Sequence, residues 1–147
     1  MKEKKIRGFS VIEIVLVLGV IGILSSFIAP KVRDYLAMAK DSKVINTLQS
    51  LRLANETYYL ENGSYPEVEV DDIGVTLNAL EKYVGDNFKL EEGKLYLDIG
   101  GSRETADSKE IKYGGKVQVE MENNEFRLTP EEGVFDYNLR GDEWSKL

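Results

Sequence analysis

The segment that decides the fold is "RGFSVIEIVLVLGVIGILSSFIAP", which runs from Arg7 to Pro30 and is apolar over most of its length. A stretch of this length crosses the ~30 Å hydrocarbon core of a bilayer as a helix. Glu13 stands near its start, although an isolated carboxylate in hydrocarbon costs several kcal/mol. An interpretation of the chain must therefore explain both the apolar run and the acid inside it.

Charge is distributed unevenly on the two sides of this segment. Four basic residues precede Gly8 (Lys2, Lys4, Lys5 and Arg7), whereas the chain from Phe9 onward has 15 basic against 25 acidic residues, a net charge of −10. The positive-inside rule places the N-terminus in the cytoplasm and exports the rest. An acidic body also argues against general nucleic-acid binding.

The 147 residues are enough for one domain of ordinary size, and they include neither cysteine nor histidine. This composition excludes disulfide bonds, thiol nucleophiles, zinc fingers and imidazole acid–base chemistry. The sequence also has no glycine-rich phosphate loop. We therefore expect no enzymatic activity.

Gly8 occupies an unusual place for a small residue near a signal segment. In an ordinary secretory signal the small residues of the cleavage site follow the apolar run, but here Gly8 precedes it. Cleavage between Gly8 and Phe9 would remove only the charged leader. The apolar segment would stay on the mature chain, with Phe9 as its free N-terminus.

These residues, "GFSVIE" followed by an apolar run and Pro30, resemble the N-terminal motif of type IV pilins and type II secretion pseudopilins. The resemblance implies that a prepilin peptidase cuts between Gly8 and Phe9 and methylates the new amine of Phe9. It divides the chain into a leader (1–8), a transmembrane and polymerisation helix (9–30) and an exported head (31–147) that includes the second half of a long helix.

Glu13 has two interpretations. It is either an interfacial acid that snorkels or protonates, or a charge that is paired after assembly. The resemblance favours the second interpretation, in which Glu13 meets the amine of Phe9 on a neighbouring subunit. Glu13 would then select correct assembly and axial register.

Gly22 and Pro30 bracket a stretch in which helix propensity is weak. Glycine loses more backbone entropy than other residues when it becomes helical, and proline lacks an N–H donor. Small residues also allow close helix packing, which is the simpler interpretation of Gly22. The resemblance implies that the corresponding stretch is partly unwound in assembled fibres. We therefore assign Gly22 and Pro30 to assembly.

The helix is predicted to continue past Pro30 and to end at Asn62–Gly63, since glycine favours the left-handed conformation after a helix. A helix over residues 10–61 would be ~75–80 Å long. The face predicted to pack on the head carries apolar positions at helical spacing: Val32, Tyr35, Leu36, Ala39, Val44, Ile45, Leu48, Leu51, Tyr58 and Tyr59. Polar positions between the apolar ones include Lys40, Asp41 and Lys43.

The rest of the chain predicts an α+β head with a small antiparallel sheet packed on the long helix. Apolar spacing indicates a short helix near Leu77 and Leu80, with Thr76 as its N-cap. Alternation predicts two hairpins, "NFKLEEGKLYLDI" and "KVQVEMENNEFRLT". The polar stretch "GGSRETADSKE" (100–110) is predicted to be a mobile loop.

Two acidic stretches, 67–72 and 136–143, offer oxygen ligands for a metal. Some major pseudopilins bind calcium in a C-terminal loop, so the resemblance keeps calcium as an alternative for 136–143. Neither stretch has the Asp-x-Asp-x-Asp-Gly spacing of a dedicated calcium loop. We interpret both as solvated acids and expect no cofactor; Trp144 is expected at the edge of the core.

The resemblance implies a structural subunit of a type IV pilus. Such a subunit starts as a single-pass protein of the cytoplasmic membrane and forms a homopolymer on the cell surface. Its partners would be the prepilin peptidase, an inner-membrane assembly platform, an assembly ATPase and minor pilins. Three alternatives remain: a major pseudopilin in a periplasmic pseudopilus, a minor or competence pilin, and a membrane enzyme or binding protein with an uncut anchor.

Overall fold

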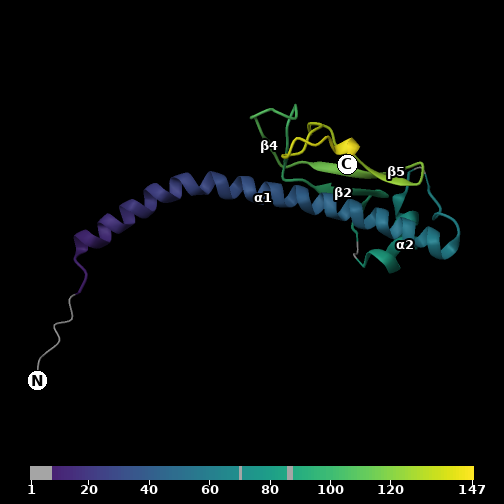
Figure 1. Ribbon diagram of the computed structural model, residues 1–147, viewed down its shortest axis with the longest axis horizontal. Coiled ribbons are helices and arrows are strands. Elements are labelled where there is room, and N and C mark those ends of the chain that lie inside the picture. The colour runs from purple at the N-terminus through teal and green to yellow at the C-terminus, as the bar shows by residue number, and fades with distance from the viewer. Residues whose placement is uncertain (1–7, 70, 86–87) are drawn as a thin grey trace, which may run out of the picture. The chain divides into compact units, whose positions relative to one another are not determined.

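The computed structural model describes residues 8–69, 71–85 and 88–147, and Figure 1 shows its elements. The predicted leader, except for Gly8, lies outside the described residues. The chain forms two compact units, Met1–Tyr35 and Leu36–Leu147, which are described in turn. The first unit contains the start of helix α1, whose bounds are Val11–Asn62 and which includes Pro30.

The second unit contains the rest of α1 and an antiparallel sheet whose strands lie in the order β1-β2-β5-β6; β3 and β4 pair separately. Figure 1 shows α1 running along this sheet. The predicted α+β fold, a long N-terminal helix packed against a small antiparallel sheet, is confirmed. The bounds are α2 Ile73–Val84, β1 Leu90–Glu91, β2 Lys94–Asp98, β3 Gly101–Ser102, β4 Lys112–Tyr113, β5 Lys116–Glu122, β6 Glu125–Pro130 and the 3-10 helix η1 Trp144–Lys146.

Both predicted hairpins are present, and each closes with a two-residue turn. Asn123 and Asn124, which connect β5 and β6, have φ angles of 52° and 65°. Glu92 and Gly93, which connect β1 and β2, have φ angles of 53° and 78°. Positive φ at both turn residues matches the right-handed twist of the strands, which explains why these short connections fix the register.

The core lies between α1, α2 and one face of the sheet. The buried residues of α1 recur every three or four positions, so they form one stripe along the helix. On β5 and β6 the buried residues alternate with exposed ones, as predicted. The main members of this core are Val44, Leu48, Leu51, Ala54, Leu77, Leu80, Leu95, Val117, Val119, Phe126, Leu128 and Trp144.

The predicted N-cap of α2 is wrong by four residues. Asp72 is the N-cap, and its Oδ1 accepts a hydrogen bond of 2.8 Å from the backbone N–H of Gly74. Thr76 is buried inside the helix, where its hydroxyl donates to the carbonyl of Glu67. Aspartate is the stronger capping residue, so the helix begins earlier.

The stretch 100–110 was predicted to be a mobile loop, and this is wrong at its start. Gly101 and Ser102 are buried and pair with Tyr113 and Lys112 as strand β3. The Ser102 hydroxyl also accepts a hydrogen bond from the N–H of Phe135. These small residues fit where the chain passes close to other backbone, which a polarity pattern does not reveal.

The predicted packing face of α1 is confirmed at Val44, Leu48 and Leu51, which are buried, but it is wrong near the entry of α1 into the head. Leu36 is 63% exposed, whereas Ala37 and Asp41 are buried. Oδ1 of Asp41 accepts a 2.8 Å hydrogen bond from the N–H of Gly100, and Oδ2 accepts one of 3.1 Å from that of Leu139. A buried carboxylate is tolerated when backbone donors satisfy both oxygens, so Asp41 joins α1 to two distant segments.

Burial raises the pKa of Asp41 above its ordinary 3.8, although the two N–H donors and Arg140 act in the opposite direction. A raised pKa in the folded state contributes stability below the unfolded pKa, and that contribution is lost as pH rises through the folded pKa. We therefore expect the stability of the wild type relative to Asp41→Asn to increase as pH falls through this range.

The measurement is urea unfolding of the full chain in detergent micelles between pH 3 and 7, monitored by the fluorescence of Trp144. Trp144 is the only tryptophan of the sequence and is fully buried. Asp107→Asn, at an exposed position, controls for the removal of one carboxylate. A stability difference that shrinks as pH falls would contradict the assignment.

Candidate functional site

Residues 8–30, named here the assembly segment, present an apolar surface that the rest of the chain leaves uncovered. Its large apolar side chains, from Phe9 to Ile28, are all at least 48% exposed, and Phe9 is 86% exposed. Helix α1 is long and apolar enough to cross a membrane. Because water disfavours so large an apolar surface, this segment requires lipid or other protein chains around it.

Glu13 lies in the first turn of α1 and caps it. The helix begins at Val11, and Oε2 of Glu13 accepts a 2.7 Å hydrogen bond from the N–H of Ser10. A glutamate three residues after an N-cap serine is one half of a capping box, which satisfies an N–H that the helix leaves unpaired. Sequence reasoning missed this contact, although the Ser-x-x-Glu spacing is its signature.

Gly8 and Phe9 both precede the helix. They have no regular secondary structure and are exposed, and a Cβ added at Gly8 would meet no atom within 4 Å. The peptide bond between them is therefore outside the hydrogen-bonded turns of α1. An exposed bond outside regular secondary structure is one that an enzyme can approach, which fits the predicted cleavage position.

Gly22 and Pro30 are both helical in this structure. A Cβ added at Gly22 would meet no atom within 4 Å, so the packing of the chain itself does not require glycine there. Proline at position 30 provides no N–H for the carbonyl four residues earlier. The predicted unwinding between these residues concerns the assembled state and stays a prediction.

The acidic stretch 136–143 is organised by a buried amide. Asn138 is fully buried, and its Oδ1 accepts hydrogen bonds from the N–H groups of Arg140 and Asp142. Its Nδ2 donates to Oδ2 of Asp142. Among the described residues no group of three or more acidic, histidine or cysteine side chains converges as a metal site would require. The sequence did not predict this hydrogen-bonding role of Asn138, because the search for metal ligands considered only charged side chains.

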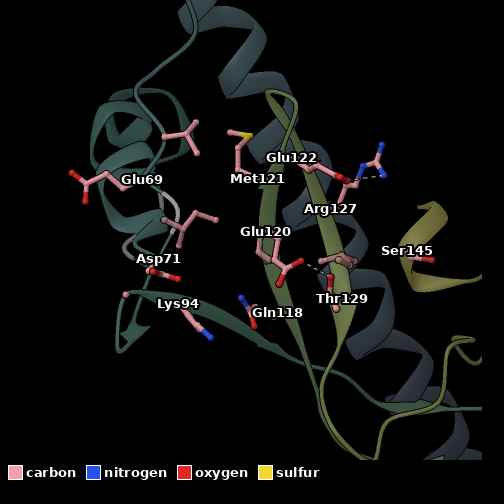
Figure 2. A pocket seen from close by; sticks show the side chains of 15 residues that line it. Glu69, Asp71, Lys94, Gln118, Glu120, Met121, Glu122, Arg127, Thr129 and Ser145 are labelled. Carbon is pink, nitrogen blue, oxygen red and sulfur yellow. Dashed lines mark hydrogen bonds and ion pairs between the residues drawn. The ribbon is translucent and has the colours of Figure 1, made fainter.

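A groove of about 570 Å³ lies over the sheet, and its lining includes Val68, Glu69, Asp71, Ile73 and Ser145 of η1. Figure 2 shows that acidic side chains, Glu69, Asp71, Glu120 and Glu122, line it together with the basic side chains of Lys94 and Arg127. Arg127 pairs with Glu122 at 3.1 Å, and Thr129 donates a hydrogen bond to Glu120. These groups satisfy one another in an open, mixed surface, so the groove lacks the convergent polar groups of a ligand site.

Comparison with known proteins gives several relatives, although no family model matches the chain. It is 34% identical over 97 residues to the type IV major pilin protein PilE of Neisseria gonorrhoeae, which is 65% of this chain and 58% of that protein. A second major pilin of the same species, PilE1, is 36% identical over 61 residues, 42% of this chain and 37% of the relative.

The type II secretion system core protein G of Klebsiella michiganensis is also similar. It is 33% identical over 69 residues, which is 47% of this chain and 49% of that protein. The chain thus spans between about a third and three fifths of the length of these relatives. Pilus and secretion-system components are both represented among them.

Proposed function

Because the chain belongs to the type IV pilin and pseudopilin family, we propose that it is the structural subunit of a type IV pilus, polymerised through its assembly segment. The observation that carries the proposal is the uncovered apolar surface of residues 9–30 on a head with its own packed core. Lipid covers this surface before assembly, and the helices of other copies cover it afterwards.

Transfer from bilayer to filament is feasible because both environments are apolar. Moving the helix from lipid into a bundle of similar helices changes its apolar burial little, so van der Waals packing and specific polar contacts decide the outcome. Gly19 and Gly22 leave open space beside the helix into which neighbouring backbones can approach. Polymerisation itself is driven from outside this chain, by an assembly platform and an ATPase.

Cleavage and methylation belong to the same proposal. A prepilin peptidase cuts the exposed bond between Gly8 and Phe9 and methylates the new amine. That amine places a positive charge four residues before Glu13. In the filament, Glu13 of one copy pairs with the amine of another, which offsets the cost of burying both charges.

A major pseudopilin of a type II secretion system is the second candidate. The similarity to core protein G favours it, and so does the lack of cysteine, because many pilins close a C-terminal disulfide loop. The assembly segment would work identically in a short periplasmic pseudopilus. In both cases the chain is a structural component that assembles with copies of itself, and we propose no catalytic role.

Electron microscopy of sheared surface material tests the pilus assignment. We expect long filaments that contain this chain, with methylated Phe9 as the N-terminus by mass spectrometry. A strain without filaments that also loses protein secretion on deletion of the gene supports the pseudopilus instead. An N-terminus at Met1 in the functional protein would overturn both candidates.

Gly8→Glu is the variant that matches this experiment. It changes only the residue before the cut, so the head should fold normally while the chain remains uncut and enters no filament. An immunoblot resolves the two forms, because the leader adds eight residues. Normal processing of Gly8→Glu would contradict cleavage by a prepilin peptidase between Gly8 and Phe9.

A further inference from the structure

A positive patch interrupts the acidic head at the first turns of α1 within it. The unit 36–147 has 13 basic and 23 acidic residues, a net charge of −10. Lys40 and Lys43 are exposed on α1, and Asp41 between them is buried on the opposite side. The sequence "KDSK" is nearly balanced in charge, but the fold turns its acid inward and leaves both ammonium groups outside.

Arg140 adds a third cation from the other end of the chain. Its Nη2 donates a 2.7 Å hydrogen bond to the hydroxyl of Ser42, so the guanidinium lies beside the same turn of α1. Asn138 holds the backbone of Arg140 in place through a hydrogen bond of 2.8 Å. We name Lys40, Lys43 and Arg140 the basic patch.

The two lysines of the basic patch differ from the five basic residues of the head that form ion pairs. Arg52, Lys82, Lys116, Arg127 and Lys146 all form ion pairs with glutamates. Within the ranges that the structure describes, neither Lys40 nor Lys43 has an ion-pair partner, even though acids outnumber bases almost two to one in this unit. The patch therefore has capacity to bind an anionic group from outside the chain.

We propose that the basic patch of one copy binds exposed carboxylates on the head of the next copy in the filament. The inference rests on the proposed function, since it concerns contacts between assembled subunits. Heads of charge −10 repel each other at close range, and a positive patch on each copy gives every head an attractive contact. Patch and carboxylates are different surfaces, so the contact is heterologous and propagates into a helical filament.

The contact sets register more than affinity. Exposed ion pairs contribute about 0–1 kcal/mol each, so three of them are a minor share of the energy that the apolar helices supply. Like charges placed opposite each other, in contrast, cost several kcal/mol and exclude wrong arrangements. The basic patch therefore favours one position of the neighbouring head among those that the uniform apolar surface allows.

Zero-length cross-linking with a carbodiimide tests the proposal directly, because it joins a lysine amine to a carboxylate only when the two are in contact. Filaments grown from a mixture of ¹⁵N-labelled and unlabelled full-length chains distinguish links between copies from links within one. We expect mixed-isotope peptides that join Lys40 or Lys43 to an aspartate or glutamate of the head. Absence of such peptides from intact filaments would overturn the inference.

Two double variants provide the matched comparison. Lys40→Glu with Lys43→Glu reverses the charge, and we expect a several-fold lower filament yield that falls further at low ionic strength. Lys40→Arg with Lys43→Arg keeps the charge, and the yield should equal that of the wild type. Equal yields from all three chains contradict the patch contact and leave the pilus assignment standing, whereas failure of the wild type to form filaments contradicts the pilus assignment.

The reversed variant also distinguishes between two candidate partners of the basic patch, the head of a second copy and anionic lipid headgroups. If lipid headgroups were the partner, the variant would lose membrane association before assembly, and filaments of the wild type would contain no intermolecular lysine links. That result would overturn the contact between heads.

Discussion

Replacing Glu13 with alanine is expected to leave the chain inserted in the membrane and correctly cut, but to abolish most filament formation. The amine of Phe9 would then be buried in the filament core without a counter-charge. Removing one partner of a buried ion pair costs about 3–5 kcal/mol, which corresponds to a loss of more than ~100-fold in an association constant. Immunoblots of sheared filaments and of membranes, from cells with this variant as the sole subunit, measure the effect.

Glu13→Gln separates the charge of Glu13 from its capping role. Glutamine still accepts a hydrogen bond from the N–H of Ser10, as glutamate does over 2.7 Å in the structure, but it carries no charge. We expect Glu13→Gln to fail in assembly as Glu13→Ala does. If the glutamine variant assembles normally and the alanine variant does not, capping of the helix is the function of this residue, and the pairing with Phe9 is wrong.

The second large effect is expected in the head. A Cβ at Gly100 would lie 1.9 Å from the carbonyl oxygen of Ala37 and 2.5 Å from its Cα, which are backbone atoms of α1. Gly100→Ala must therefore push the strand connection away from the helix and break the hydrogen bond from its N–H to Asp41. Overpacking and a lost buried hydrogen bond together predict a destabilisation of about 2–5 kcal/mol.

Urea unfolding in micelles, followed by the fluorescence of Trp144, measures this loss. Gly19→Ala is the matched control, because a Cβ there would meet no atom within 4 Å and the residue lies in the other unit. Since a whole domain is stable by only about 5–15 kcal/mol, Gly100→Ala should also lower the amount of folded head in cells. Equal stability of the two variants would show that the connection has room to relax.

Some features of this chain follow from short-range signals and were therefore predictable. The end of α1 at Asn62 and the hairpin around Asn123 and Asn124 depend on residues that favour left-handed backbone, and such residues are visible in the sequence. The alternation of buried residues on β5 and β6 follows from the two-residue period of a strand. The resemblance to type IV pilins and pseudopilins also rests on a local signal, the stretch "GFSVIE" and the apolar run that follows it.

Other features depend on contacts between distant residues. In the sequence, Asp41 has the pattern of an exposed charged position on a helix. It is a buried acceptor only because the N–H groups of Gly100 and Leu139, 59 and 98 residues away, donate to its carboxylate. Asn138 likewise gains its role from the loop that closes around it. No periodicity or composition rule places such partners together, so the entry of α1 into the head was assigned to the wrong face.

The start of α1 has a consequence for maturation. The helix begins at Val11, and Gly8 and Phe9 precede it, so the predicted cut falls in a part of the chain that contributes no helical hydrogen bond. In the proposed maturation the charge at the N-terminus changes: four lysine and arginine charges and the charge of Glu3 would leave with the leader, and one amine would appear at Phe9. Under this proposal the same helix, with the same cap at Ser10, would serve first as an anchor held in place by the leader charges and then as a filament subunit able to leave the bilayer.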